Sequence, residues 1–183
     1  MSSRVKVSRE EFVKALLHWF VINSSRKAIE QEAKVQDLTS DAPLEFREAK
    51  ELFGLSLSNR AEFTILVEEL MALNLWIIVL SCEMTVKDIE KRSDCLDVFH
   101  RRFFEQFLRE TGDDFKQWLA SLTVKYCEYS EAMKTDLWAL AYLIQRNLHG
   151  EGPPDAVRQF QIALYVSGGL KALAKALDQY EIE

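Results

Sequence analysis

The stretch from Leu70 to Cys82, LMALNLWIIVLSC, decides the fold that this sequence predicts. It is the longest run without a charged residue, and its second half is apolar on every side of a helix. A helix that is apolar all round lies in the interior of a protein. Upstream, Phe63 to Met71 has an apolar stripe at helical spacing, with Glu68 and Glu69 on the other side. We therefore predict a central helix over about residues 59–83, half exposed where it begins and buried where it ends.

Length and composition favour one helical domain around that helix. The chain has 183 residues, of which 48% are hydrophobic, so it is long enough to bury a sizeable core. It contains only 6 glycines and 3 prolines, and spacings of about 3.6 residues dominate the apolar pattern. We predict an all-α fold, a single-domain bundle of six or seven helices over residues 1–183.

In the first third of the chain, capping residues and glycines indicate where helices begin and end. Ser8 has Glu11 three positions later, which is the spacing of a capping box, so the first helix should begin there. Residues 24–42 are mostly polar, and we predict a helix half that projects, frays or packs on another chain. Residues 44–53 form a short predicted helix that Gly54 can close.

The second half of the chain contains one long periodic stretch and one plain boundary. A single helix from Asp113 to His149 would be about 55 Å long, so we predict a break near Ser130 to Asp136. Residues 150–154, GEGPP, form the boundary before a C-terminal helical segment that Asp155 caps. In that segment Ser167-Gly168-Gly169 predicts a bend or the close approach of another backbone. Its first apolar face consists of Val157, Phe160, Ala163 and Leu164.

Charge, cysteines and hydropathy exclude several classes of protein. The formal net charge of -6 argues against a nucleic-acid binder, which would need a basic face. The three cysteines include no CxxC pair, so we expect free thiols rather than a disulfide framework or a structural zinc site. The central apolar run is shorter than the about 20 residues of a transmembrane helix. The N-terminus has no apolar signal segment, and we expect a soluble, cytoplasmic protein.

No catalytic constellation is recognisable in the sequence. Asp97 and His100 form the only carboxylate–histidine pair at a spacing of three, whereas a di-metal bundle needs two such motifs and two further carboxylates. The adjacent Asp113 and Asp114 suit the N-terminus of a helix. We therefore expect no metal, no cofactor and no enzymatic activity, and rank an enzyme using Asp97 and His100 last.

Two kinds of binding protein remain. The first binds another protein, whose identity the sequence does not give, and a homodimer is one form of this. Its predicted surface is the place where arginine and phenylalanine crowd, at Arg101, Arg102 and Phe104. The second binds an apolar small molecule inside the bundle. Its predicted pocket is lined by Trp76, Phe103, Trp118, Tyr126 and Trp138.

From about residue 52 to residue 149, the order of sequence features favours a protein that binds another protein. The segments concerned are LFGLSLSNRAEF, ELMALNLWIIVL, CLDVFHRRFFEQFLRETGDD, KYCEYSEAMK and LWALAYLIQRNLHG. Their order resembles the ubiquinol–cytochrome c chaperone family, helical factors that assemble the respiratory bc1 complex. Asn74 stands where that family has a histidine, and Ser81-Cys82 where it has an arginine. The resemblance implies an assembly chaperone and adds Arg146 and Asn147 to the partner-binding candidates.

Overall fold

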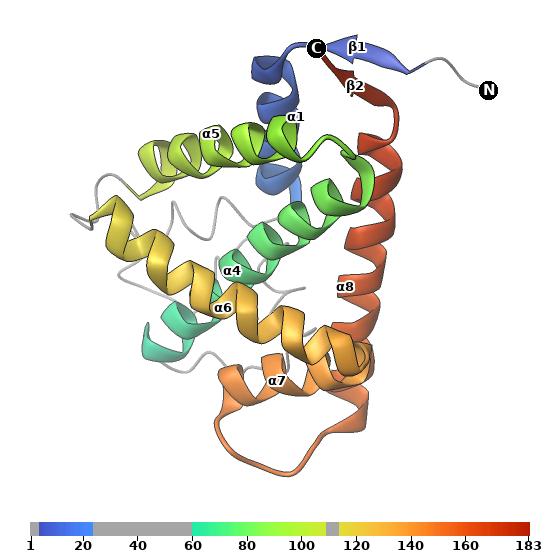
Figure 1. Cartoon of the computed structure of the whole chain (residues 1–183). Helices are drawn as coiled ribbons and strands as arrows, with labels where there is room; N and C mark the ends of the chain where they lie inside the picture. The colour runs from blue at the N-terminus through green and yellow to red at the C-terminus, as the bar shows by residue number, and fades with distance from the viewer. Residues whose placement is uncertain (1–3, 24–59, 109–113) are drawn as a thin grey trace.

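The computed structural model describes residues 4–23, 60–108 and 114–183, and in these parts it is helical apart from one small sheet (Figure 1). This confirms the prediction of an all-α fold. The predicted helix at 44–53, its closing Gly54 and the polar stretch 24–42 lie outside the described residues. The elements are β1 (Val5–Val7), α1 (Arg9–Asn23), α4 (Arg60–Thr85), α5 (Ile89–Phe107), α6 (Phe115–Thr135), α7 (Leu137–His149), α8 (Ala156–Leu177) and β2 (Tyr180–Ile182).

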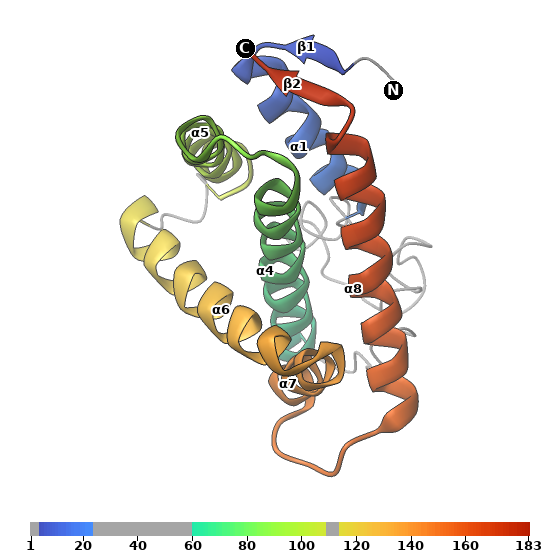
Figure 2. The same ribbon diagram turned by 45° about the vertical axis from the view of Figure 1, so that its right-hand side comes forward.

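Helix α4 is the centre of the described structure. It packs against each of the other five described helices, and Figures 1 and 2 show it in the middle of the assembly. Every residue from Ala72 to Ile78 is buried, so no side of the helix faces water there. The predicted central helix is thereby confirmed, with bounds within two residues of those expected. Its apolar composition all round is satisfied because neighbouring helices cover all of its sides.

Glu69 departs from the predicted pattern on α4. The sequence places it on the polar side of the helix, but only 2% of its surface is exposed. One carboxylate oxygen accepts hydrogen bonds from the Tyr129 hydroxyl at 2.7 Å and the Asn147 amide at 2.8 Å, and the other is paired with the Lys125 ammonium. These partners lie on α6 and α7, so the carboxylate joins three helices. A buried charge needs such partners to offset its lost hydration.

Both ends of the described chain meet in a small sheet that the sequence does not predict. Strands β1 and β2 pair in parallel, with Val5 opposite Tyr180 and Val7 opposite Ile182. Arg4 also forms an ion pair with Asp178, next to the strands. Three-residue strands are too short for an alternating pattern to be recognised.

The two predicted helix boundaries after α5 are confirmed. Helix α6 ends at Thr135, and the Asp136 carboxylate accepts a hydrogen bond from the Ala139 amide at 2.7 Å to begin α7. The Asp155 carboxylate caps α8 in the same way, by accepting from the amides of Val157 and Arg158. Aspartate at these positions satisfies amides that have no partner within the helix.

Helix α8 runs without a break through Ser167-Gly168-Gly169, so the two glycines do not end the helix. Gly169 faces the interior instead. A Cβ atom on Gly169 would lie 3.4 Å from Ile77 Cδ1 on α4 and 3.9 Å from the indole of Trp19 on α1. The missing side chain therefore gives room to the core residue Ile77 and to the partly buried Trp19, and the close neighbours are side chains rather than another backbone.

Candidate functional site

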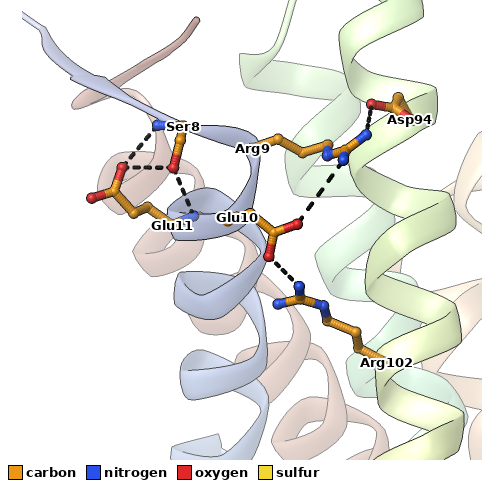
Figure 3. A network of polar contacts seen from close by, with 6 residues as sticks. All are labelled: Ser8, Arg9, Glu10, Glu11, Asp94 and Arg102. Carbon is orange, nitrogen blue, oxygen red and sulfur yellow. Dashed lines mark hydrogen bonds and ion pairs between the residues drawn. The ribbon is translucent and has the colours of Figure 1, made fainter.

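Arg102, a predicted binding residue, lies in the contact between α1 and α5. Its guanidinium forms an ion pair with Glu10 on α1 (Figure 3). Beside it, Arg9 donates a hydrogen bond to Asp94 on α5 at 2.7 Å and lies 4.0 Å from Glu10. Arg102 therefore helps to hold α1 against α5, whereas the side chain of its neighbour Arg101 is exposed.

Phe104 is half-buried in a group of aromatic rings between α5 and α6. Its ring centroid lies 5.3 Å from that of Phe115 and 5.4 Å from that of Trp118. Rings at such distances attract one another beyond the area they bury. Part of the Phe104 surface is thus already used in packing the two helices together.

Arg146 and Asn147 lie on α7, at the opposite end of the molecule from most of α5 in both ribbon views (Figures 1 and 2). Asn147 is a structural residue, because its amide donates to the buried Glu69. Arg146 is exposed, and its Nε atom lies 4.0 Å from a carboxylate oxygen of Glu151. The five predicted partner-binding residues are therefore divided between two regions and do not form one surface.

Four of the five predicted pocket residues lie in the interior or partly in it, where they contact other side chains. The Trp76 indole donates a hydrogen bond to the Ser130 hydroxyl at 3.1 Å and meets the Tyr129 ring edge to face at 5.8 Å. Phe103 and Trp118 stack with their centroids 5.7 Å apart. These rings occupy the space between α4, α5 and α6.

Trp138 does not share that space, which corrects its assignment to an internal pocket. Its side chain is 48% exposed, and its ring stacks on Phe160 of α8, which is 51% exposed, with a centroid distance of 6.3 Å. Two large aromatic rings thus lie together on the outside of the molecule.

His100 is a buried histidine with both ring nitrogens engaged. Nδ1 lies 2.8 Å from the carbonyl oxygen of Leu96, which only accepts, so Nδ1 carries the proton and donates. Nε2 then accepts from the Tyr126 hydroxyl at 3.0 Å. Burial lowers the pKa of His100 and raises that of Tyr126, so both stay neutral near pH 7.

The described residues contain no grouping of three or more histidine, cysteine, aspartate or glutamate side chains that could hold a metal ion. The buried thiol of Cys82 is a poor nucleophile, since burial raises its pKa to about 12. Burial also raises the pKa of Cys95.

In the part of the chain that the structure describes, the largest continuous group of exposed apolar side chains lies on α7 and α8. Among the described residues, ten large apolar side chains are exposed, and half of them belong to this group, while the others are spread over β1, α4, α5 and α6. Its members are neighbours, because residues three or four apart are adjacent on a helix and Trp138 contacts Phe160. We call this group the α7–α8 face; it consists of Trp138, Tyr142, Val157, Phe160 and Leu164.

On α8 the exposed stripe continues beyond its apolar part. At about 100° per residue, Gly168, Lys171 and Lys175 fall on the same side of the helix as Phe160 and Leu164, and all three are exposed. The opposite side forms the contact with the core. It consists of Ile162, Ala163, Val166, Leu170, Leu173 and Leu177.

Sequence reasoning missed the α7–α8 face although a signal for it exists. The sequence pattern puts Val157, Phe160, Ala163 and Leu164 on one apolar face of the helix, but it does not say that this face points outward. The series from Ile162 to Leu177 is the longer of two apolar stripes on opposite sides of α8, and a helix buries its longer stripe first. The shorter stripe then has to be exposed.

Comparisons of the chain with known protein families, with curated proteins and with solved structures find no match. Within the described part of the chain, no helix combines the length and the apolar character that crossing a bilayer requires.

Proposed function

We propose that this chain is a non-enzymatic protein-binding factor and that the α7–α8 face is its contact surface. The observation that carries the proposal is the exposed stacked pair of Trp138 and Phe160, extended by Tyr142, Val157 and Leu164. Exposing these side chains to water is unfavourable, at about 25 cal/mol per Å² of apolar surface. A partner that covers the face recovers this free energy.

The composition and the size of the face both support a protein as the partner. Tryptophan, tyrosine and phenylalanine are enriched in protein interfaces, because they bury large areas at a small cost in side-chain entropy. Five side chains exposed by a third to two thirds present roughly 500 Å², close to the largest patch on a typical monomer, which is often functional. In the finer form of the proposal, the chain is an assembly chaperone like the family it resembles between about residues 52 and 149.

Photo-crosslinking in cells of the source organism tests the proposal. A photoreactive phenylalanine analogue replaces Phe160, and in a second variant it replaces Val124, an equally exposed apolar residue on α6 outside the face. A third variant carries it in place of Arg101, the exposed residue of the α5 candidate surface. We expect a discrete protein adduct from position 160 and only background from position 124.

The adducts are identified by mass spectrometry, and a second copy of the chain counts as a partner. Adducts from position 101 together with background at position 160 would move the contact to α5 and refute the assignment to α7–α8. Background at all three positions would contradict the protein-binding proposal itself.

A further inference from the structure

We infer that the partner of the α7–α8 face is an amphipathic helix of another protein. This helix is apolar along most of its contact surface and acidic at one end, and it passes close to α8 at Gly168. The inference rests on the proposed function, because it names the kind of partner that the same surface takes. Three features of α8 support it, namely the spacing of its exposed residues, the exposed glycine and the lysines beyond that glycine.

The exposed stripe of α8 has the length and the spacing of a helix-binding surface. Helix α8 runs along one side of the molecule in Figure 2, and the stripe extends over about 27 Å of it at 1.5 Å per residue. Helices that cross at about 20° stay in contact over several turns, because their ridges and grooves match. An extended segment would instead need unpaired backbone groups, which the side of a helix does not offer. The members of the stripe are Val157, Phe160, Leu164, Gly168, Lys171 and Lys175.

Gly168 lies in the middle of the stripe, and nothing in the described structure requires it to lack a side chain. A Cβ atom on Gly168 would meet no neighbour within 4 Å beyond its own stretch of helix, whereas Gly169 makes room for Ile77. Its position is inside α8, where alanine is more stable than glycine. The missing side chain does let another helix approach closely, since interaxial distances depend on the side chains at the contact. Gly168 is therefore where the partner helix comes nearest.

The charge of the stripe determines the chemistry of one end of the partner. Lys171 and Lys175 are exposed, and neither ammonium takes part in an ion pair within the described chain. Asp178, the next charged residue, is already paired with Arg4. The two lysines therefore leave positive charge at this end of the stripe, and carboxylates on a partner are complementary to it. Their aliphatic stems also extend the apolar contact beyond Gly168.

Selection from a displayed peptide library tests the inference on the full chain. The probes are random peptides of about 20 residues, which span the stripe when helical. Peptides that also bind Phe160→Glu are removed, because this variant places a charge in the exposed apolar part of the stripe. We expect the enriched peptides to have apolar residues at helical spacing and acidic residues toward one end. Enrichment of extended or basic peptides overturns the inference, and so does the absence of any enrichment.

Gly168→Leu should change binding and stability in different directions. Leucine favours the helix of the free chain, so the unfolding temperature should be unchanged or higher. In the complex its side chain fills the space of the partner backbone, and the dissociation constant of the enriched peptide should rise at least about tenfold. Ala176→Leu is the matched control, because it adds a similar side chain to an exposed position of α8 outside the stripe. Equal affinity of the two variants would refute the close approach at Gly168.

The double variant Lys171→Glu/Lys175→Glu tests the acidic end of the partner. It should weaken binding of the same peptide by at least about tenfold at low salt, because attraction between the charges becomes repulsion. A peptide whose acidic residues are replaced by lysine should bind the double variant well and the parent poorly. If neither exchange alters the affinity, the lysines do not contact the partner and the inference fails.

Crosslinking at position 160 separates this inference from the proposed function. If the selection fails while position 160 gives an adduct with another protein, the contact surface stands and only the acidic helix is refuted. An adduct with a second copy of the chain also overturns the inference, because the inferred partner is a different protein. Cosedimentation with vesicles of phosphatidylserine and phosphatidylcholine, lost in Phe160→Glu, would assign the face to a membrane surface and refute both proposals.

Discussion

The indole of Trp76 lies between α4 and α6, with only 2% of its surface exposed and its nitrogen bonded to Ser130. We predict that Trp76→Ala lowers the free energy of unfolding by about 3–5 kcal/mol, because it empties a large buried site. Denaturation in urea measures this. Trp138→Ala is the matched control, since the same residue type on the surface should cost less than about 1 kcal/mol. Equal losses in the two variants would contradict the difference in burial.

His100 gives the molecule a pH dependence of known sign. Its pKa in the folded state is lowered by burial, so the unfolded chain binds more protons as the pH falls below the ordinary histidine value near 6.5. The contribution of His100 to stability is therefore complete above that pH and is lost as the pH falls toward the folded pKa. The slope from this one group is at most about 1.4 kcal/mol per pH unit.

We predict that His100→Gln loses less stability than the parent between pH 7 and pH 5. Thermal unfolding at both pH values in the two proteins measures the difference. His18→Gln, which changes an exposed histidine on α1, serves as the control and should follow the parent. If the parent and His100→Gln lose equal stability between pH 7 and pH 5, the imidazole of His100 is not buried and neutral in the folded protein.

At the scale of elements, the buried carboxylate of Glu69 joins α4 to α6 and α7. Burial and the neighbouring Glu69 carboxylate raise the pKa of Tyr129, so its hydroxyl stays protonated and donates. We predict that Glu69→Ala destabilises by about 3–5 kcal/mol, because it removes one member of a buried ionic network and leaves the others unpaired. Glu68→Ala, at an exposed neighbouring position, should cost less than about 0.5 kcal/mol. Chemical denaturation measures the free energy of unfolding of both variants. Equal losses in Glu69→Ala and Glu68→Ala would contradict the network.

The sequence predicts elements well where a local signal is sufficient. Ser8 with Glu11 and Asp155 are capping residues whose effect is confined to one helical turn, and both caps act as predicted. The break between α6 and α7 follows from a length argument alone. None of these predictions depends on how another helix packs.

Prediction fails where the answer depends on a neighbouring element. Glu69 has the position of a surface residue on α4, and only the Lys125, Tyr129 and Asn147 side chains from α6 and α7 make it a buried one. Gly169 has the local signature of a bend, yet Ile77 of α4 explains it. The two strands are paired across nearly the whole chain. Each outcome depends on tertiary packing that a single sequence does not display.

At the scale of the whole molecule, the sequence identifies candidate binding residues by their type, and only the fold shows which of them face the surface. Arg101, Phe104 and Trp76 could be recognised by type, but whether each one faces the core or the surface depends on which helices pack together. Trp138 was expected inside and is outside, stacked on Phe160. The α7–α8 face therefore became visible only with the fold.

The central claim is that the α7–α8 face contacts another protein. Photo-crosslinking tests it most directly, because an adduct reports a partner that lies against the substituted side chain. Phe160 belongs to the face and stacks on Trp138, whereas Val124 is exposed on α6 outside it.

We predict a discrete protein adduct from a photoreactive analogue at position 160 and only background from the same analogue at position 124. Background at position 160, or adducts of similar yield at both positions, would contradict the claim that this face is the contact surface.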